Sequence, residues 1–297
     1  MKLIQSFKDW CYKVYFRLIR KKCLISPADY LYLRNGEMTF SQLIIGTRIM
    51  DIERWQKDHR PRFHYANALT LTKNKSFDTV EADKHFASLL ESVEKNGYNP
   101  ESRIAINNCF TVNDGTHRAA LAFCLGMEAI PANYYNYPPH WHIEQLREAE
   151  REERFHQDYE QIRSRYDEIQ EELKSKGYTC CCLVFNVTDI SYTELMLELS
   201  RIANVYKIYR IDTSKYNQLP SEKRMELTGM EAAVENGYFI SLLPTLNDYQ
   251  YNKERIVFHS ISKLADRLQE QHPLIMVTDN YVDGVSCFKR LQEYFLE

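Results

Sequence analysis

The residues with the clearest chemical potential form the run Asp114-Gly-Thr-His-Arg118, which follows an apolar stretch ending at Val112. The apolar stretch predicts a strand and the residues from His117 onward predict a helix, so the run lies at a strand-to-helix turn. The first turn of a helix presents backbone N–H groups and a partial positive charge to an anion. Arg118 adds a planar guanidinium suited to phosphate, and Thr116 adds a hydroxyl. The run therefore predicts a phosphate-binding turn.

The same residues include groups that can move a proton. Asp114 lies just outside the expected helix, where a carboxylate can accept a proton or hold a cation, and His117 can donate a hydrogen bond or titrate. Each residue also has a structural interpretation, because Asp114 or Thr116 could cap the helix and Gly115 could make the turn. An acid, a hydroxyl, an imidazole and a guanidinium within five residues together favour function.

The run and the residues after it resemble a known signature. Residues 114–122, followed by Leu125-Gly126 and Ile130-Pro131, are similar to the D-G-x-H-R-x-x-A…G…I-P pattern of the ParB/sulfiredoxin superfamily. The resemblance covers about residues 40–137, including the predicted helix at 81–97. Members of this superfamily bind nucleotide phosphates at the helix that the motif opens. They include partition proteins that bind CTP and DNA, sulfiredoxins that use ATP, and small kinases that phosphorylate free serine.

Individual residues separate these branches. Sulfiredoxins have a cysteine before His-Arg, where this chain has Thr116. Partition proteins resemble G-E-R-R and continue into a helix-turn-helix segment, whereas the segment after this motif is acidic, so DNA binding is disfavoured. Asp114, His117 and Arg118 match the free-serine-kinase branch, which also has an acidic residue on an earlier strand. Glu53, in the run Ile-Met-Asp-Ile-Glu, is the candidate for that acid.

The resemblance implies transfer of a phosphoryl group from ATP, or another nucleoside triphosphate, with Mg²⁺, to a hydroxyl of an amino acid, sugar or polyol. It makes Asp114, His117 and Glu53 the catalytic residues, and Gly115, Thr116, His117 and Arg118 the nucleotide-binding residues. Proteins with this pattern also resemble those that accompany bacterial surface-polysaccharide assembly. An alternative stays open, in which the motif is a non-catalytic module that binds a nucleotide or a phosphorylated sugar.

The N-terminal segment is basic, with a net charge of +6 over residues 1–22. Its large apolar residues recur at helical spacing, which predicts an amphipathic helix within residues 1–30. Such a helix can lie at a membrane surface, or it can pack on the protein with a solvated basic face. The segment lacks the apolar core and cleavage site of a secretory signal, and no run reaches the ~20 apolar residues of a membrane span. We expect a cytoplasmic protein, with contact to the inner membrane face as an open alternative.

The sequence predicts an α+β ParB/sulfiredoxin-like domain over residues 31–140, a charged helical connector over 141–177, and a layered α/β domain over 178–297. In the connector, 18 of the 35 residues 142–176 are charged. After Gly177, strand-like segments alternate with helical ones. The expected strands are 180–187, 205–211, 238–243, 255–259 and 274–278, and the expected helices are 194–203, 221–236, 262–270 and 286–295.

Charge and residue types also bear on nucleic-acid binding, on the state of the cysteines and on other candidate sites. The net charge of −3 excludes a basic field over the whole protein for nucleic acid, which leaves only residues 1–22 for such a role. The Cys180–Cys182 triplet predicts buried reduced thiols. His140 and His142 lack a third ligand, so no metal site is predicted, and residues 57–64 form a basic loop that could reach phosphate. Asp189, Asp212 and the run 278–280 follow expected strands, so the C-terminal half could instead carry a transferase site.

Overall fold

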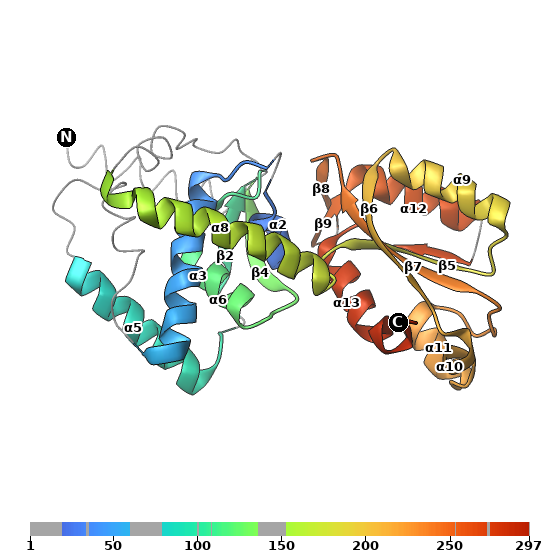
Figure 1. Cartoon of the computed structure of the whole chain (residues 1–297), viewed down its shortest axis with the longest axis horizontal. Coiled ribbons are helices and arrows are strands. Elements are labelled where there is room, and N and C mark those ends of the chain that lie inside the picture. Colours follow the sequence, from blue (N-terminus) through green and yellow to red (C-terminus); the bar gives the residue numbers. More distant parts are fainter. Residues whose placement is uncertain are drawn as a thin grey trace. The chain divides into compact units, whose positions relative to one another are not determined.

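The computed structural model describes residues 20–33, 36–59, 79–99, 101–107, 109–135, 153–252, 254–271 and 274–296. The chain divides into two compact units, Met1–Gln170 and Glu171–Glu297 (Figure 1). Both combine helices with β-sheet, so the expectation of a mixed, layered fold is confirmed at that level. Within the described residues, no helix is long and apolar enough to cross a membrane.

The first unit contains a sheet in the order β3-β2-β4-β1. Strand β4 pairs in parallel with β2 and antiparallel with β1, while β2 pairs antiparallel with β3. The strands of this sheet are β1 (Lys21–Ile25), β2 (Ile104–Asn107), β3 (Val112–Asp114) and β4 (Ile130–Tyr135). The helices that begin in this unit are α2 (Pro27–Leu31), α3 (Phe40–Asp58), α5 (Thr79–Asn96), α6 (Thr116–Cys124) and α8 (Glu153–Ser175).

Strand β1 differs from the helix predicted over residues 1–30, in the part of that segment that the structure describes. Along β1, Cys23 and Ile25 are buried while Lys22 and Leu24 are exposed. This alternation has the period of a strand, and pairing with β4 satisfies the backbone. Ser26 then caps α2 through a capping box with Asp29. The possible membrane contact through residues 1–22 falls mostly on residues outside the described part.

Helix α3 is another element that the sequence analysis did not predict. Thr39 caps it through a capping box, in which Thr39 Oγ1 accepts from the Gln42 amide at 3.2 Å and Gln42 Oε1 accepts from the Thr39 amide at 2.9 Å. The helix is buried on most sides, so its apolar residues do not follow one stripe. Glu53 therefore lies on a helix, whereas the resemblance placed the earlier acid on a strand.

Helix α8 packs against α3 along an apolar stripe whose residues Ile162, Tyr166 and Ile169 are fully buried. A Cβ added at Gly46 of α3 would lie 2.6 Å from Ile162 Cγ2 and 2.8 Å from Tyr166 Cε2, so the two helices approach closely there. The Tyr166 hydroxyl donates to the Gln42 carbonyl at 2.8 Å. Burial raises the pKa of Tyr166, which keeps this phenol protonated. The charged segment after residue 141 thus supplies a packed helix that ends before Gly177, where the sequence expects its end.

The second unit contains a four-stranded sheet in the order β10-β5-β7-β6. All neighbouring strands pair antiparallel. The strands are β5 (Cys180–Phe185), β6 (Ala203–Arg210), β7 (Gly237–Pro244) and β10 (Ile275–Val277), and β8 (Tyr249–Asn252) forms a hairpin with β9 (Arg255–Phe258). The helices are α9 (Asp189–Ser200), α10 (Thr213–Asn217), α11 (Ser221–Thr228), α12 (His259–Gln271) and α13 (Tyr281–Leu291), followed by a 3₁₀ turn at Gln292–Tyr294.

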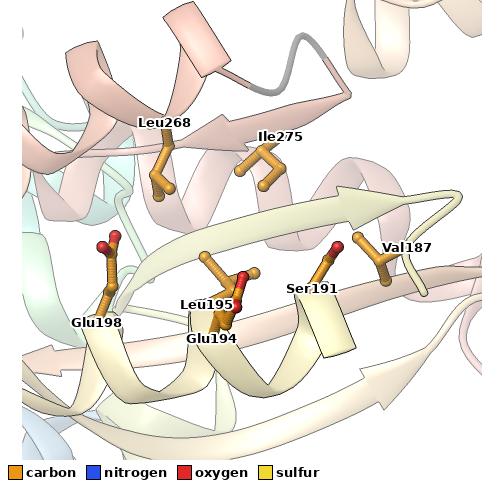
Figure 2. Close-up of a pocket in the computed structure, with 7 residues that line it drawn as sticks. All are labelled: Val187, Ser191, Glu194, Leu195, Glu198, Leu268 and Ile275. Atoms are coloured by element: carbon orange, nitrogen blue, oxygen red, sulfur yellow. The ribbon is translucent and has the colours of Figure 1, made fainter. Parts of the chain in front are cut away.

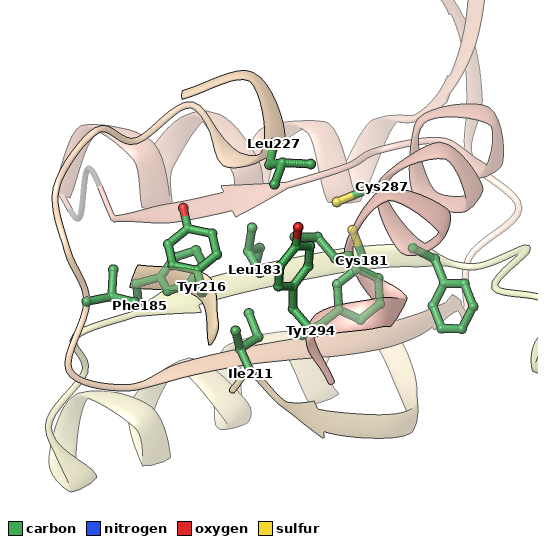
Figure 3. Close-up of a cluster of buried hydrophobic side chains, with 12 residues drawn as sticks. Cys181, Leu183, Phe185, Ile211, Tyr216, Leu227, Cys287 and Tyr294 are labelled. Atoms are coloured by element: carbon green, nitrogen blue, oxygen red, sulfur yellow. The ribbon is translucent and has the colours of Figure 1, made fainter. Parts of the chain in front are cut away.

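Helices cover both faces of this sheet, with α9 and α12 on one side and α10, α11 and α13 on the other (Figure 1). Alternate residues of β5 face the second side, where Cys181, Leu183 and Phe185 join an apolar cluster with Tyr216 and Cys287 (Figure 3). Cys180, Cys181 and Cys182 are all fully buried and form no disulfide, as the sequence predicts. Burial raises the pKa of Cys182, so its thiol stays protonated.

The antiparallel pairing alters one expectation about function. Strands β5 and β6 run in one direction and β10 runs in the other, because each is antiparallel to its neighbour. Asp279 therefore follows its strand at the opposite end of the sheet from Asp189 and Asp212. The Asp212 carboxylate accepts from Ser214 Oγ at 2.6 Å and from the Lys215 amide at 3.1 Å, which makes it a helix cap. These aspartates do not form a single strand-end site.

Candidate active site at the start of helix α6

The turn between β2 and β3 is held by side-chain hydrogen bonds. Asn107 is buried, and its Oδ1 accepts from the Cys109 amide at 2.9 Å and from the Thr111 amide at 3.1 Å. Ser41 Oγ donates to the Val112 carbonyl and accepts from the Val112 amide, each at 3.1 Å. These contacts fix the start of β3, a three-residue strand whose last residue, Asp114, opens the predicted motif.

Gly115 connects β3 to α6 in a conformation that other residues rarely adopt, with φ at 86°. A Cβ at this position would lie 2.9 Å from Arg118 Nη2 and 2.9 Å from Ile104 Cγ2, so side chains close in on its backbone. As the N-cap residue, Gly115 makes no side-chain hydrogen bond to the helix. The first-turn amides of α6 therefore lack the internal cap that Thr39 gives α3.

Arg118 is the cation of the motif, and its guanidinium makes several contacts. Its Nη1 donates to Ser102 Oγ at 2.8 Å and to the Arg103 carbonyl at 2.5 Å. Its Nη2 forms an ion pair with Asp114 Oδ2 at 3.5 Å, which is at the long limit of a hydrogen bond. The Asp114 side chain is 79% exposed while that of Arg118 is 27% exposed. The guanidinium is thus held in place beside the helix start, and the carboxylate reaches into solvent.

His117 faces the interior of the unit. Its ring centroid lies 4.6 Å from that of Phe86 on α5. Burial, together with the smaller effects of the Arg48, His85 and Arg118 charges, lowers the pKa of His117 to about 2. The imidazole is therefore neutral at physiological pH. A neutral imidazole of such low basicity is suited to hydrogen bonding and positioning more than to proton exchange.

Two residues near the motif were not singled out from the sequence. Arg48 of α3 is 3% exposed, and its Nη1 donates to the Ile44 carbonyl at 2.8 Å. Tyr98 lies near Arg118, whose charge lowers the phenol pKa while the larger effect of burial raises it. The Tyr98 hydroxyl is buried and has no hydrogen-bond partner within the described residues. Only the fold brings these groups to the motif, because neither lies in a recognisable pattern.

The structure gives Glu53 a partner on α8. Arg165 Nη2 donates to Glu53 Oε1 at 2.7 Å, and Arg165 Nε lies 3.2 Å from both carboxylate oxygens. Asp114, Gly115, Thr116, His117 and Arg118 form one continuous turn, and no contact joins Glu53 to that turn in the described part of the chain. Glu53 is thus engaged in packing α8 onto α3.

The remaining sequence candidates lie elsewhere or outside the described residues. His59 ends α3 with its Nε2 3.6 Å from Glu94 Oε1 and its ring 5.1 Å from that of Trp55. His64, His140 and His142 lie outside the described residues. Among the residues that the structure describes, no group of three or more histidines, cysteines or acidic residues could hold a metal ion.

The turn therefore combines three properties that suit a phosphorylated ligand. It has a helix start without a side-chain cap, a fixed guanidinium, and a second arginine close enough to lower the pKa of His117. An exposed carboxylate lies at its edge. No family model, no curated protein and no solved structure matches the chain.

Proposed function

We propose that this protein is a nucleotide-dependent phosphotransferase, which transfers a phosphoryl group from ATP or another nucleoside triphosphate to a hydroxyl of an amino acid, sugar or polyol. The observation that carries the proposal is the start of α6, where Gly115 leaves the helix without a side-chain cap and Arg118 is fixed beside it. Helix amides and a guanidinium are the donors that phosphate oxygens need. The resemblance of residues 114–122 to the superfamily motif supports the same ligand.

Each residue of the turn has a role in this proposal. The amides of Thr116, His117 and Arg118 bind phosphate oxygens, and the Thr116 hydroxyl adds a further donor. Arg118 keeps its plane fixed through Ser102 and Arg103, so it can stabilise charge without reorganising. Asp114 is exposed enough to accept the proton of the substrate hydroxyl. Mg²⁺ bound with the nucleotide would offset phosphate charge, and one carboxylate with the phosphates suits its preference for oxygen.

A second candidate function is a module that binds a nucleotide or phosphorylated sugar without turnover. The low pKa of His117 favours it, because the imidazole offers little basicity for catalysis. The two functions share the ligand and differ in the role of Asp114. If the protein binds a nucleotide but phosphorylates none of the hydroxyl compounds offered to it, the non-catalytic module is the correct function.

The binding test compares wild type with Thr116→Glu in a thermal-shift panel of ATP, ADP, CTP and GTP, each with and without Mg²⁺. A glutamate in the first turn favours the helix but repels phosphate, so this variant should keep its melting temperature and lose the shift. Ser221→Glu places the same charge at the first residue of α11 and serves as the matched control. Equal thermal shifts in wild type and Thr116→Glu would show that the nucleotide does not bind at this turn.

The turnover test measures phosphoryl transfer from ATP to free serine and to a panel of sugars and polyols. Asp114→Asn should retain the nucleotide-dependent thermal shift and lose at least about a hundredfold in rate, in line with the contribution of a general base. Asp167→Asn, which changes an exposed carboxylate on α8, should behave as wild type. Full activity in Asp114→Asn would exclude the proposed base.

A further inference from the structure

A groove runs between α9 and α12 on one face of the sheet in the second unit. Two adjoining cavities form it, with volumes of about 100 Å³ and about 330 Å³, and Glu198 lines both. Figure 2 shows the smaller cavity, with Leu268 and Ile275 facing the side chains of α9. Every lining residue belongs to the second unit, so the groove is independent of the motif at α6.

The larger cavity is basic. Arg201, Lys263 and Arg267 line it together with Ser260, and Glu198 supplies its one carboxylate. Arg267 Nη2 lies 2.8 Å from Glu198 Oε2, so this cation is paired with the carboxylate of the cavity. Arg201 and Lys263 make no ion pair in the described part of the chain. The lining of the larger cavity thus carries two more positive charges than its own carboxylate, Glu198, offsets.

Neighbouring charges do not remove this excess. One acidic side chain outside the lining, Asp248, contacts a lining residue: its Oδ2 accepts from the Ser260 amide at 2.7 Å and its Oδ1 accepts from Ser260 Oγ at 3.3 Å. Asp248 therefore caps the start of α12 and makes no ion pair with Arg201 or Lys263 in the described residues. Counting it still leaves the basic end with one uncompensated cation.

The smaller cavity continues the groove with a different chemistry. Leu195, Leu268 and Ile275 form an apolar wall, while Ser191 and Glu194 place a hydroxyl and a carboxylate along α9 (Figure 2). Carboxylates and hydroxyls are acceptors for alcohol groups, and an apolar wall packs against C–H surface. One end of the groove thus suits an anionic group, and the other suits a short chain that carries hydroxyls.

We propose that this groove binds the phosphate monoester of a small polyhydroxy compound. Arg201 and Lys263 bind the phosphate, and Glu194 and Ser191 bind hydroxyls of the remainder. Arg267 adds charge while its pair with Glu198 keeps both side chains in place. The site does not depend on the proposed phosphotransferase function, because it uses no residue of the first unit.

The test is a calorimetric titration of the whole chain with glycerol 3-phosphate, inorganic phosphate and glycerol, at low and at physiological ionic strength. Glycerol 3-phosphate should bind, and its affinity should fall as salt screens the exposed cations. The double variant Arg201→Ala/Lys263→Ala should weaken this binding by at least about fivefold. Arg118→Ala should leave in place the binding that depends on Arg201 and Lys263, which separates the groove from any binding of the same ligand at the turn of α6.

The matched control is Lys223→Ala/Arg210→Ala, which removes two exposed charges from other parts of the second unit. An equal loss in the control would mean that only the net charge matters, and it would overturn the site. Unchanged binding in Arg201→Ala/Lys263→Ala, or no binding by wild type, would also overturn it. If inorganic phosphate binds as tightly as glycerol 3-phosphate, the assignment of hydroxyl binding to Glu194 and Ser191 is wrong.

Discussion

The guanidinium of Arg165 on α8 contacts both carboxylate oxygens of Glu53 on α3, with its shortest distance at 2.7 Å. The side chains are 16% and 32% exposed, so the pair is shielded in part from solvent. It joins segments that lie 112 residues apart in the chain. A residue that the sequence resemblance marks as catalytic therefore has a structural partner.

Replacing Glu53 distinguishes these two roles. Glu53→Gln should lower the free energy of unfolding by about 1–2 kcal/mol, because it weakens a charge-assisted hydrogen bond that is partly exposed. Urea unfolding measures this loss, and nucleotide-dependent turnover should persist at the wild-type level. Gln56→Ala, at an exposed position of the same helix, should change stability by less than about 0.5 kcal/mol. If Glu53→Gln loses turnover while its stability is unchanged, Glu53 has a catalytic role.

The buried imidazole of His117 makes stability depend on pH in a defined direction. Its pKa is lowered from 6.5 to about 2 in the folded protein, so the unfolded chain binds a proton that the folded chain does not. The free energy of unfolding therefore has its full value, as far as His117 is concerned, above pH 6.5. It falls by ~1.4 kcal/mol for each pH unit below that. His117→Gln should flatten the dependence between pH 7 and pH 5, as urea titrations can show. If stability depends on pH in the same way in wild type and His117→Gln, the His117 imidazole is not buried in its neutral form.

Gly284 marks the closest approach of α13 to the start of β5. A Cβ at this position would lie 1.7 Å from the Thr179 carbonyl oxygen, which belongs to the backbone and cannot rotate away. Gly284→Ala should destabilise the second unit by more than about 3 kcal/mol, as measured by its unfolding transition. Ser286→Ala on the same helix should cost less than about 1 kcal/mol. Equal effects would mean that α13 can shift away from the sheet.

The cysteines should react in an order set by burial. Cys109 and Cys124 are partly exposed, whereas Cys23, Cys287 and the triplet Cys180–Cys182 are buried. Burial also raises the pKa of Cys23 to about 12, which suppresses its thiolate. Among the cysteines of the described residues, alkylation of the native protein followed by peptide mass spectrometry should modify Cys109 and Cys124 first. Early modification of the triplet would show that β5 opens to solvent.

Elements with a clear period and clear end signals were predictable from the sequence. The helix expected at 81–97 is α5, which ends at Asn96 just before the turn residue Gly97. Helix α11 shows how a single residue limits such predictions. The expected helix over 221–236 ends at Thr228, because Gly229 adopts a left-handed conformation at φ 74° and stops it.

Elements buried on several sides were harder to predict. Helix α3 is rich in β-branched residues, and its burial removes the polar face that normally reveals a helix. In the candidate site, the strand-to-helix turn at Gly115 was predictable from local sequence. The contacts of Arg118 with Ser102 and of Glu53 with Arg165 join distant segments, so no local pattern could indicate them.

The pairing of β1 with β4 also determines where the chain can be shortened. Cys23 and Ile25 are 2% and 0% exposed, so a deletion that extends past residue 25 would remove a strand and two core side chains. If membrane contact through residues 1–22 is tested with lipid vesicles, loss of binding by that deletion variant would report unfolding. It would not show that the basic segment binds the membrane. A variant that begins at Arg20 keeps β1 and its partners intact. Any study of the basic segment by truncation should therefore use this boundary.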